Sequence, residues 1–132
     1  MAQENVEVVR QVYAGWERGD FAVGTGLFDH HAVLVIDPAI PDGGIFLGQE
    51  GIRTYMLRFL DAWESLTIAA KSFRPAGDSV FVEVLQVGTG QGSGIPAEQR
   101  YFQLWTFRGD KVVRLETVLS QSDALEAVGL RE

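Results

Sequence analysis

Two acidic residues occupy positions from which a side chain could move a proton. Asp37 directly follows the apolar, β-branched run at residues 32–36, and Pro38 and a loop rich in proline and glycine come after it. Burial at the end of such a strand, beside a loop able to act as a lid, would raise the pKa of the carboxyl toward the range of a general base. Asp-Pro pairs also form ordinary turns. Asp37 is therefore a candidate catalytic base, with a simple turn as the alternative.

Glu83 is the second candidate, because it interrupts the otherwise apolar run at residues 80–87. A strand period of two puts it on the same face as Phe81, Leu85 and Val87. If that face lines the interior, the carboxyl must be paired or protonated; if it faces solvent, Glu83 is an ordinary surface residue. The residues alone leave both placements open.

Other reactive groups are scarce. There is no cysteine, which excludes thiolate nucleophiles, disulfides and Cys-ligated metals. The only histidines, His30 and His31, are adjacent and would point to opposite faces of a strand, so a mixed metal site with Asp29 and Asp37 is the less favoured reading. The glycine-rich run at 88–94 lacks the third glycine of a dinucleotide loop and leads into a strand, which favours a hairpin. We expect no metal and no cofactor.

Periodicity indicates the elements that position these residues. Apolar residues at helical spacing predict helices over 6–18 and 49–64, the first with Asn5 as its N-cap and Gly19 at its end. Weaker patterns predict a short helix over 21–28 and a last helix over 122–129. Strands are predicted over residues 32–36, 45–47, 66–74, 79–87, 98–107 and 112–119. Helices first and antiparallel hairpins afterwards are the order of an α+β fold.

Composition narrows the class of protein. The 132 residues suit a single domain over 1–132, and a 46% hydrophobic content supports a packed core. Eleven basic against 18 acidic residues give a net charge of −7, which argues against nucleic acid and anionic membrane surfaces. The longest apolar run, 32–36, is far shorter than the roughly 20 residues of a membrane span, and the N-terminus lacks a signal-peptide pattern. We expect a soluble, cytoplasmic protein.

Five motifs resemble those of the SnoaL-like family in the nuclear transport factor 2-like superfamily. They are Val-Tyr-x-x-Trp-x-x-Gly-Asp-Phe at 12–21, Leu-Phe at 27–28, Gly-x-Glu-Gly-Ile-Arg-x-Tyr at 48–55, Ala-Gly-Asp at 76–78 and Trp-Thr-Phe-Arg-x-x-Lys-Val-Val-Arg-Leu at 105–115. The resemblance implies an α+β cone, in which a curved mixed, mostly antiparallel sheet is wrapped by three to four helices around a pocket. It also implies a homodimer through the outer sheet face, for which the apolar outward set would be Val80, Val82, Val84, Phe102, Leu104 and Val118.

Ketosteroid isomerase, another member of the superfamily, combines an Asp base with an oxyanion hole made of a Tyr and a protonated Asp. The resemblance puts that base at Asp37, the phenol at Val12 and the protonated Asp at Gln103. The phenol is thus lost, and Tyr13 lies one place further, about 100° around the helix. The Gln103 amide can still donate a hydrogen bond. Steroid isomerisation therefore does not follow from the pattern.

The same correspondence implies which side chains face the pocket. The residues that it places there are Tyr55, Glu83, Leu85, Val87, Gln103, Trp105, Leu115 and Thr117. The residues that we predict to contact a ligand are Tyr13, Trp16, Tyr55, Phe59, Glu83 and Trp105.

The leading hypothesis is a pocket protein for a largely apolar, carbonyl-bearing small molecule. If the protein is catalytic, Asp37 would move a proton α to that carbonyl without a cofactor, as in an isomerase, cyclase or dehydratase. Gln103, with either Tyr13 or Tyr55, would then stabilise the oxyanion. The alternative is a non-catalytic ligand-binding or dimeric assembly module of the same fold, since this superfamily hosts many functions.

Overall fold

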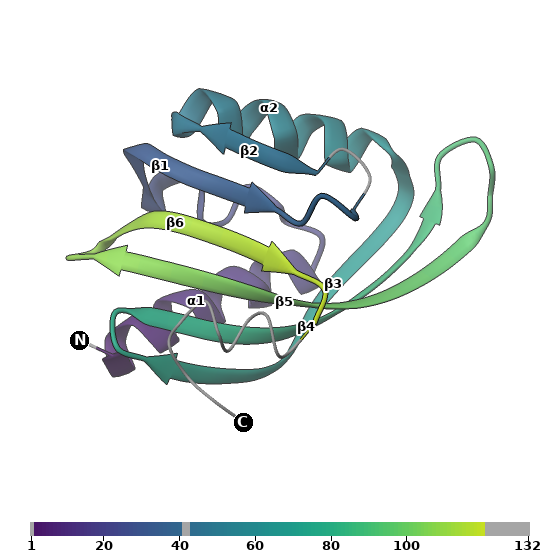
Figure 1. Ribbon diagram of the computed structural model, residues 1–132. Coiled ribbons are helices and arrows are strands. Elements are labelled where there is room, and N and C mark those ends of the chain that lie inside the picture. Colours follow the sequence, from purple (N-terminus) through teal and green to yellow (C-terminus); the bar gives the residue numbers. More distant parts are fainter. Residues whose placement is uncertain (1, 41–42, 121–132) are drawn as a thin grey trace.

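The computed structural model describes residues 2–40 and 43–120 of the chain (Figure 1). This part holds two α-helices, one 3-10 helix and six strands. In chain order they are α1 (Ala2–Glu17), the 3-10 helix η1 (Thr25–Leu27), β1 (Phe28–Ile36), β2 (Gly44–Leu47), α2 (Gly48–Asp61), β3 (Trp63–Ala76), β4 (Ser79–Gly90), β5 (Pro96–Arg108) and β6 (Lys111–Val118).

The six strands form one mixed sheet in the order β2-β1-β6-β5-β4-β3. Only β1 and β6 pair in parallel; the other four pairings are antiparallel, as the hairpin pattern predicts. Gly77 and Gly109 open two-residue turns with φ values of 61° and 63°, a left-handed conformation that favours glycine. Figure 1 shows a strongly curved sheet with α1 behind it and α2 along the β1–β2 edge. The glycine-rich run lies in the β4–β5 hairpin, as expected.

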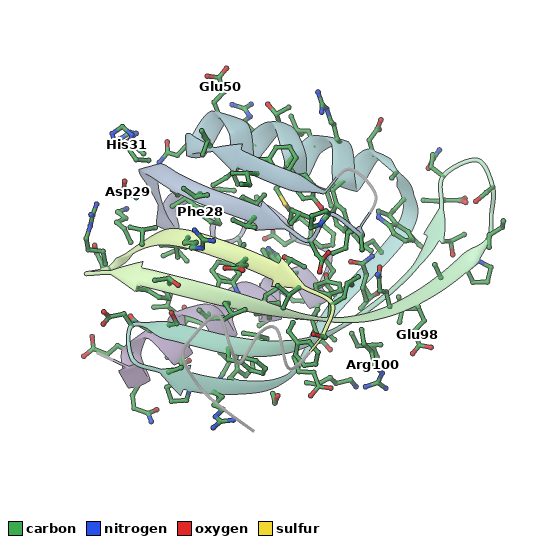
Figure 2. All side chains as sticks on the ribbon, in the orientation of Figure 1. Phe28, Asp29, His31, Glu50, Glu98 and Arg100 are labelled. Atoms are coloured by element: carbon green, nitrogen blue, oxygen red, sulfur yellow. The ribbon has the colours of Figure 1, made fainter. Side chains whose placement is uncertain are left out.

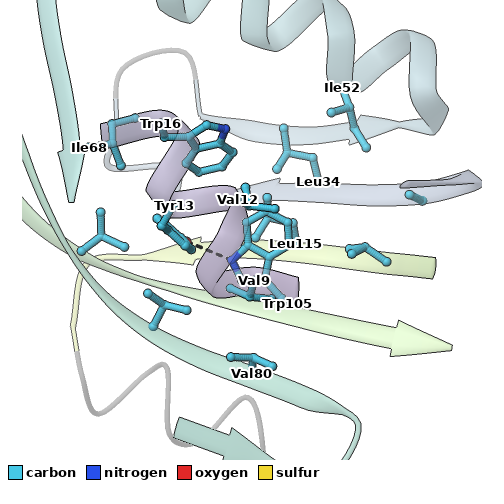
Figure 3. Packing of buried hydrophobic residues seen from close by; sticks show 14 of the residues in the cluster. Val9, Val12, Tyr13, Trp16, Leu34, Ile52, Ile68, Val80, Trp105 and Leu115 are labelled. Carbon is cyan, nitrogen blue, oxygen red and sulfur yellow. Dashed lines mark hydrogen bonds between the residues drawn. The ribbon is translucent and has the colours of Figure 1, made fainter. Parts of the chain in front are cut away.

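The main core lies between α1 and the inner face of the sheet (Figure 3). The apolar face of α1 packs against a row of β4 valines and against Trp105, whose side chain is completely buried. The aromatic rings of Tyr13 and Trp16 lie 5.9 and 5.8 Å from the ring of Trp105. Aromatic packing of this kind adds about 0.5–1.5 kcal/mol per pair to the burial of apolar area. The α1 residues that contribute are Val6, Val9, Val12, Tyr13 and Trp16.

A second, smaller apolar cluster covers the outer face of the sheet. It consists of Phe81, Leu104 and Val118, with Phe102 packed against them. The expected outward positions of Phe102, Leu104 and Val118 are therefore confirmed.

The expected outward positions of Val80, Val82 and Val84 are wrong, because these residues belong to the inner core. Both alternating rows of β4 are apolar, so hydrophobicity does not reveal which row faces inward. A homodimer through the outer face stays a prediction.

The helices differ from the expectation in several respects. The helix predicted over 49–64 ends at Asp61, and Trp63 and Glu64 begin β3. Residues 21–24 form a turn followed by η1, so no α-helix spans 21–28. Gly24 has a φ of 95°, and a Cβ atom at Gly15 would collide with the Val23 side chain, so the segment lies directly on α1. Asn5 lies inside α1 and is buried rather than capping it.

The described residues thus contain two α-helices instead of three to four; the helix predicted over 122–129 lies outside them. Neither of these two helices has the length and apolar character needed to cross a membrane.

Candidate functional site

Two adjoining cavities lie between the inner face of the sheet, the end of α1 and helix α2. The outer cavity has a volume of about 840 Å³ and the inner one about 70 Å³. They share four wall residues, Trp16, Leu34, Met56 and Leu115. The outer volume falls within the roughly 300–1,000 Å³ that small-molecule sites occupy, whereas the inner one fits only a small group.

The outer cavity is walled mainly by apolar side chains. One wall is the segment that follows α1. The other wall is α2, whose charged and polar lining residues all lie toward the N-terminal end of that helix. Gly15 and Gly24 have no side chains, so the 21–25 segment packs closely against α1 and forms one wall of the cavity. The residues found only in this cavity are Phe21, Ala22, Val23, Gly24, Thr25, Phe28, Gln49, Glu50, Ile52, Arg53, Leu57 and Leu60.

The inner cavity combines apolar side chains with neutral polar ones. None of its wall residues in the described chain is Asp, Glu, Lys, Arg or His. Hydrogen bonding, not charge pairing, is therefore the polar chemistry that this compartment offers. The residues found only in this cavity are Ile36, Ile40, Tyr55, Phe59, Ile68, Gln86, Gln99, Tyr101, Gln103 and Thr117.

A continuous chain of hydrogen bonds leads from the core to this cavity. The indole N–H of Trp105 donates to the Tyr13 hydroxyl oxygen at 2.9 Å (Figure 3), and the Tyr13 hydroxyl donates to Oε1 of Gln103. The amide nitrogen of Gln103 donates in turn to Oγ1 of Thr117 at 3.0 Å. All four side chains are buried. Burial raises the pKa of Tyr13 well above its ordinary value, so the phenol stays protonated and keeps donating.

A second phenol–amide pair lies in the cavity wall. The Tyr101 hydroxyl donates to Oε1 of Gln86 at 2.9 Å, and both side chains are buried. Desolvation raises the pKa of Tyr101, with the nearby Tyr55 adding to the effect. Neither Gln86 nor Tyr101 was among the predicted site residues. The available signal was Gln86 itself, a polar residue in an apolar strand at the same parity as Val84.

Asp37 lies at the edge of the inner cavity but lines neither cavity. It follows the last residue of β1, and its backbone N–H donates to the carbonyl oxygen of Thr117 at 2.9 Å. Its Oδ1 accepts the backbone N–H of Ala39 at 2.9 Å, which is the turn geometry of the alternative reading. Its neighbours Ile36 and Ile40 do line the inner cavity. The half-buried carboxylate is thus held beside the pocket.

Glu83 faces the opposite side of the sheet from the cavities. It pairs across the β4–β5 ladder with the outer residue Phe102, whereas Gln103 pairs with the inner residue Val82. Its carboxylate lies 3.7 Å from the Arg100 guanidinium, and both side chains are well exposed. The expected pocket-side positions of Glu83, Leu85 and Val87 are therefore wrong. The cause is the one that misplaced the β4 valines: a shift of one residue turns every side chain of a strand to the other face.

The remaining predicted ligand-contacting residues divide into two groups. Trp16, Tyr55 and Phe59 line the cavities. Tyr13 and Trp105 line neither cavity and act behind the wall, through hydrogen bonds to Gln103 and to each other. The expected inward positions of Gln103, Leu115 and Thr117 are confirmed.

The two histidines lie away from the cavities, near the start of β1. Figure 2 shows Asp29 and His31 at the same end of the molecule, remote from Glu98 and Arg100. The His31 backbone N–H donates to Oδ1 of Asp29, which lowers the pKa of that carboxyl. Within residues 2–40 and 43–120, no three His, Cys, Asp or Glu side chains gather in a metal-binding arrangement.

Comparison with known proteins supports the resemblance seen in the sequence. The SnoaL-like domain family matches residues 9–115. A putative SnoaL-like polyketide cyclase from Jannaschia sp. CCS1 superposes with a TM-score of 0.77 at 16% identity, covering 99% of this chain and 95% of that one.

TerC co-crystallised with polyporic acid gives a TM-score of 0.75 at 22% identity, covering 94% of this chain and 97% of TerC. A protein with a ketosteroid isomerase-like fold from Catenulispora acidiphila DSM 44928, in complex with trimethylamine, gives 0.71 at 23% identity, covering 95% and 94%. At these identities the likeness concerns the fold. No curated protein matches the sequence.

Proposed function

The chain belongs to the SnoaL-like family, and from this premise we propose that its adjoining cavities bind one largely apolar, carbonyl-bearing small molecule on which Asp37 acts as a general base. The apolar body of the ligand occupies the outer cavity. Its carbonyl oxygen enters the inner cavity and meets the Gln103 amide. The single observation that carries this proposal is the contrast between a large apolar compartment and a small one walled by uncharged hydrogen-bonding groups.

The strand register supports a shared site for base and donor. Ile36 pairs with Thr117 across β1 and β6, and Thr117 pairs with Gln103 across β6 and β5. Asp37, one residue beyond Ile36 and outside β1, therefore begins about two strand spacings, or about 10 Å, from the Gln103 backbone, a distance that one small ligand can span. The hydrogen bond from Ala39 to Oδ1 orients the carboxylate and leaves Oδ2 for a proton.

The proposed reaction is a proton transfer through an enolate. The Asp37 carboxylate removes a proton from the carbon α to the carbonyl, and the electron pair of that C–H bond moves onto the carbonyl oxygen. The Gln103 N–H stabilises the resulting oxyanion. Where the ligand has a β,γ double bond, return of the proton from Asp37 to the γ-carbon moves that double bond to the α,β position while the carbonyl re-forms, which completes an isomerisation without a cofactor.

Solved structures with a similar fold hold small organic molecules. TerC was co-crystallised with polyporic acid, and the protein of Catenulispora acidiphila forms a complex with trimethylamine, so this fold accommodates small organic molecules in both proteins. The Jannaschia protein is described as a putative polyketide cyclase. Cyclisation of a polyketide through an enolate would use the same base and the same oxyanion donor.

A second candidate function is binding without catalysis. It is favoured by one observation: no carboxylate lines the inner cavity in the described chain, and Asp37 already serves a turn through Ala39. In that case the same ligand would bind and Asp37 would contribute only to the loop.

Exchange of α-protons with solvent separates the two functions. We expect wild-type protein in D2O to accelerate deuterium incorporation α to the carbonyl of 1-indanone, measured by proton NMR, and Asp37→Asn to lower that rate by at least about 100-fold, the usual contribution of a general base. Binding of 1-indanone, followed by tryptophan fluorescence to which Trp16 in the cavity wall contributes, should be retained in Asp37→Asn.

Asp78→Asn is the matched control, because Asp78 lies in the β3–β4 turn and lines neither cavity. Equal exchange rates in wild type and Asp37→Asn, with binding intact, would eliminate the catalytic proposal and leave binding alone.

A further inference from the structure

The direction of the hydrogen-bond chain behind the inner cavity is fixed at its first member. An indole N–H donates and never accepts. Since Trp105 donates to the Tyr13 oxygen at 2.9 Å, the phenolic hydrogen of Tyr13 is left to donate to the next group, which is Oε1 of Gln103. The chain therefore runs outward from the core, one donor after another.

The orientation of the Gln103 amide follows from that direction. Its oxygen is turned toward Tyr13, which lines neither cavity, and its nitrogen toward Thr117, which lines the inner cavity. One N–H of the amide is used by the Thr117 oxygen at 3.0 Å. A primary amide has two N–H groups, so a second one remains on the Thr117 side.

The chain ends at the hydroxyl of Thr117. Its oxygen accepts from Gln103, so its own hydrogen is left for a further acceptor, and among the described residues no hydrogen bond donated by this hydroxyl is found. Thr117 is 4% exposed, and no buried side-chain nitrogen or oxygen in the described chain lacks a partner. The cavity is therefore the remaining place for the acceptor.

We infer that the chain Trp105–Tyr13–Gln103–Thr117 makes the Gln103–Thr117 end of the inner cavity a donor site, in which the Thr117 hydroxyl and the Gln103 N–H recognise a ligand oxygen without hydrogens, such as a ketone, quinone or ester carbonyl. This inference rests on the proposed binding function and specifies the polar end of its ligand. Thr117 is then a ligand-binding residue, and Tyr13 and Trp105 are positioning residues that act through Gln103.

The hydrogen bond between Tyr101 and Gln86, in the wall of the same cavity, also runs from a phenol to an amide oxygen. Tyr101 donates to Oε1 of Gln86, so the Gln86 amide also has its oxygen occupied and its N–H groups available. Because burial keeps Tyr13 and Tyr101 protonated, both phenols keep donating to their amide oxygens at neutral pH. At the Gln103–Thr117 end of the cavity, a ligand N–H or O–H therefore meets other donors and loses affinity.

Three bicyclic probes of similar shape test this preference: 1-indanone carries only an acceptor, indole only a donor, and indane neither. Isothermal titration calorimetry would give the three dissociation constants. For wild type we expect 1-indanone to bind about tenfold more tightly than indane, the equivalent of one good hydrogen bond, and indole to bind no more tightly than indane.

The variants assign the preference to the chain. Thr117→Val should reduce the 1-indanone preference to about threefold or less, while Thr117→Ser should retain it, because serine keeps the hydroxyl. Tyr13→Phe should relax the rejection of indole, since the amide is then free to turn. Thr106→Val is the matched control: it removes a hydroxyl from β5 that bonds to Ser79 at 2.9 Å and lies outside both cavities.

The outcomes separate this inference from the function on which it rests. Equal binding of indole and 1-indanone to wild type, or an unchanged preference in Thr117→Val, would overturn the donor site at Gln103 and Thr117 and leave the binding pocket standing. Failure of all three probes to bind would overturn both. Melting temperatures of every variant, compared with that of Thr106→Val, show whether an altered preference reflects loss of the fold instead.

Discussion

The two faces of one sheet use polar side chains in opposite ways. On the inner face, Gln103 and Thr117 are buried, uncharged and joined in a directed chain of hydrogen bonds. On the outer face, Glu83 and Arg100 are charged, exposed and separated by 3.7 Å. Gln103 and Thr117 lie across the β5–β6 ladder, and Glu83 and Arg100 across the β4–β5 ladder. Gln103 and Arg100 thus share strand β5 and face opposite sides of the sheet because their positions differ by an odd number of residues. Burial therefore decides whether a polar contact is essential to the fold or incidental to it.

The largest effect should come from deleting the inner aromatic side chain. Trp105→Ala removes a fully buried ring and the first donor of the chain, and we expect it to lower the free energy of unfolding by about 3–5 kcal/mol. Phe102→Ala truncates a half-buried ring that packs against the outer cluster, and it should lower the free energy of unfolding by less than half as much. Urea denaturation followed by circular dichroism measures both. Similar losses in the two variants would contradict the difference between the faces.

Alkaline pH should weaken the inner face selectively. Burial raises the pKa of Tyr13 and Tyr101, so between pH 10 and these raised values the unfolded chain releases protons that the folded chain keeps. The stabilisation is complete below pH 10, and its loss reaches about 1.4 kcal/mol per pH unit for each tyrosine. Urea denaturation at pH 9 to 11.5 should show this decline, and Tyr101→Phe should reduce its slope. An identical slope in Tyr101→Phe would refute this cause.

The smallest effect should come from the outer ion pair. The Arg100 and Glu83 side chains are 64% and 36% exposed, so solvent screens their attraction. We expect Glu83→Gln to change the free energy of unfolding by less than about 1 kcal/mol, and the change to vanish in 1 M salt. A larger, salt-resistant loss would mean that this face is buried in an assembly, as the predicted homodimer requires.

The elements that the sequence predicts best are those whose patterns have one solution. The stripes of α1 and α2 each have a single apolar face, and the turns at Gly77 and Gly109 each need a left-handed residue. The antiparallel hairpins of β3 to β6 and the α+β class follow from these elements and from the family motifs. The 21–28 segment was predicted as a helix from its residue types, yet contact with α1 through Gly15 and Gly24 holds it as a turn and η1.

The candidate site is less predictable, because its contacts join distant parts of the chain. Tyr13 and Gln103 are 90 residues apart, and nothing in either local sequence announces the hydrogen bond between them. Tyr13 seemed misplaced relative to the ketosteroid isomerase phenol, yet it reaches Gln103 from behind the cavity wall. In β4, both alternating rows of side chains are mainly apolar, so hydrophobicity did not show which row faces inward, and Glu83 was assigned to the wrong face of the sheet.

The parallel pairing of β1 with β6 has a consequence for how the chain reaches its fold. Leu34 of the first strand lies beside Leu115 of the last, so a ribosome releases β1 long before its partner exists. During that interval the apolar residues Ala32, Leu34 and Ile36 lack the β6 side of their packing. Contacts this distant slow folding and leave an unpaired strand edge open to other chains. Chains that stop before β6 should therefore aggregate in the cell, whatever ligand the finished pocket takes.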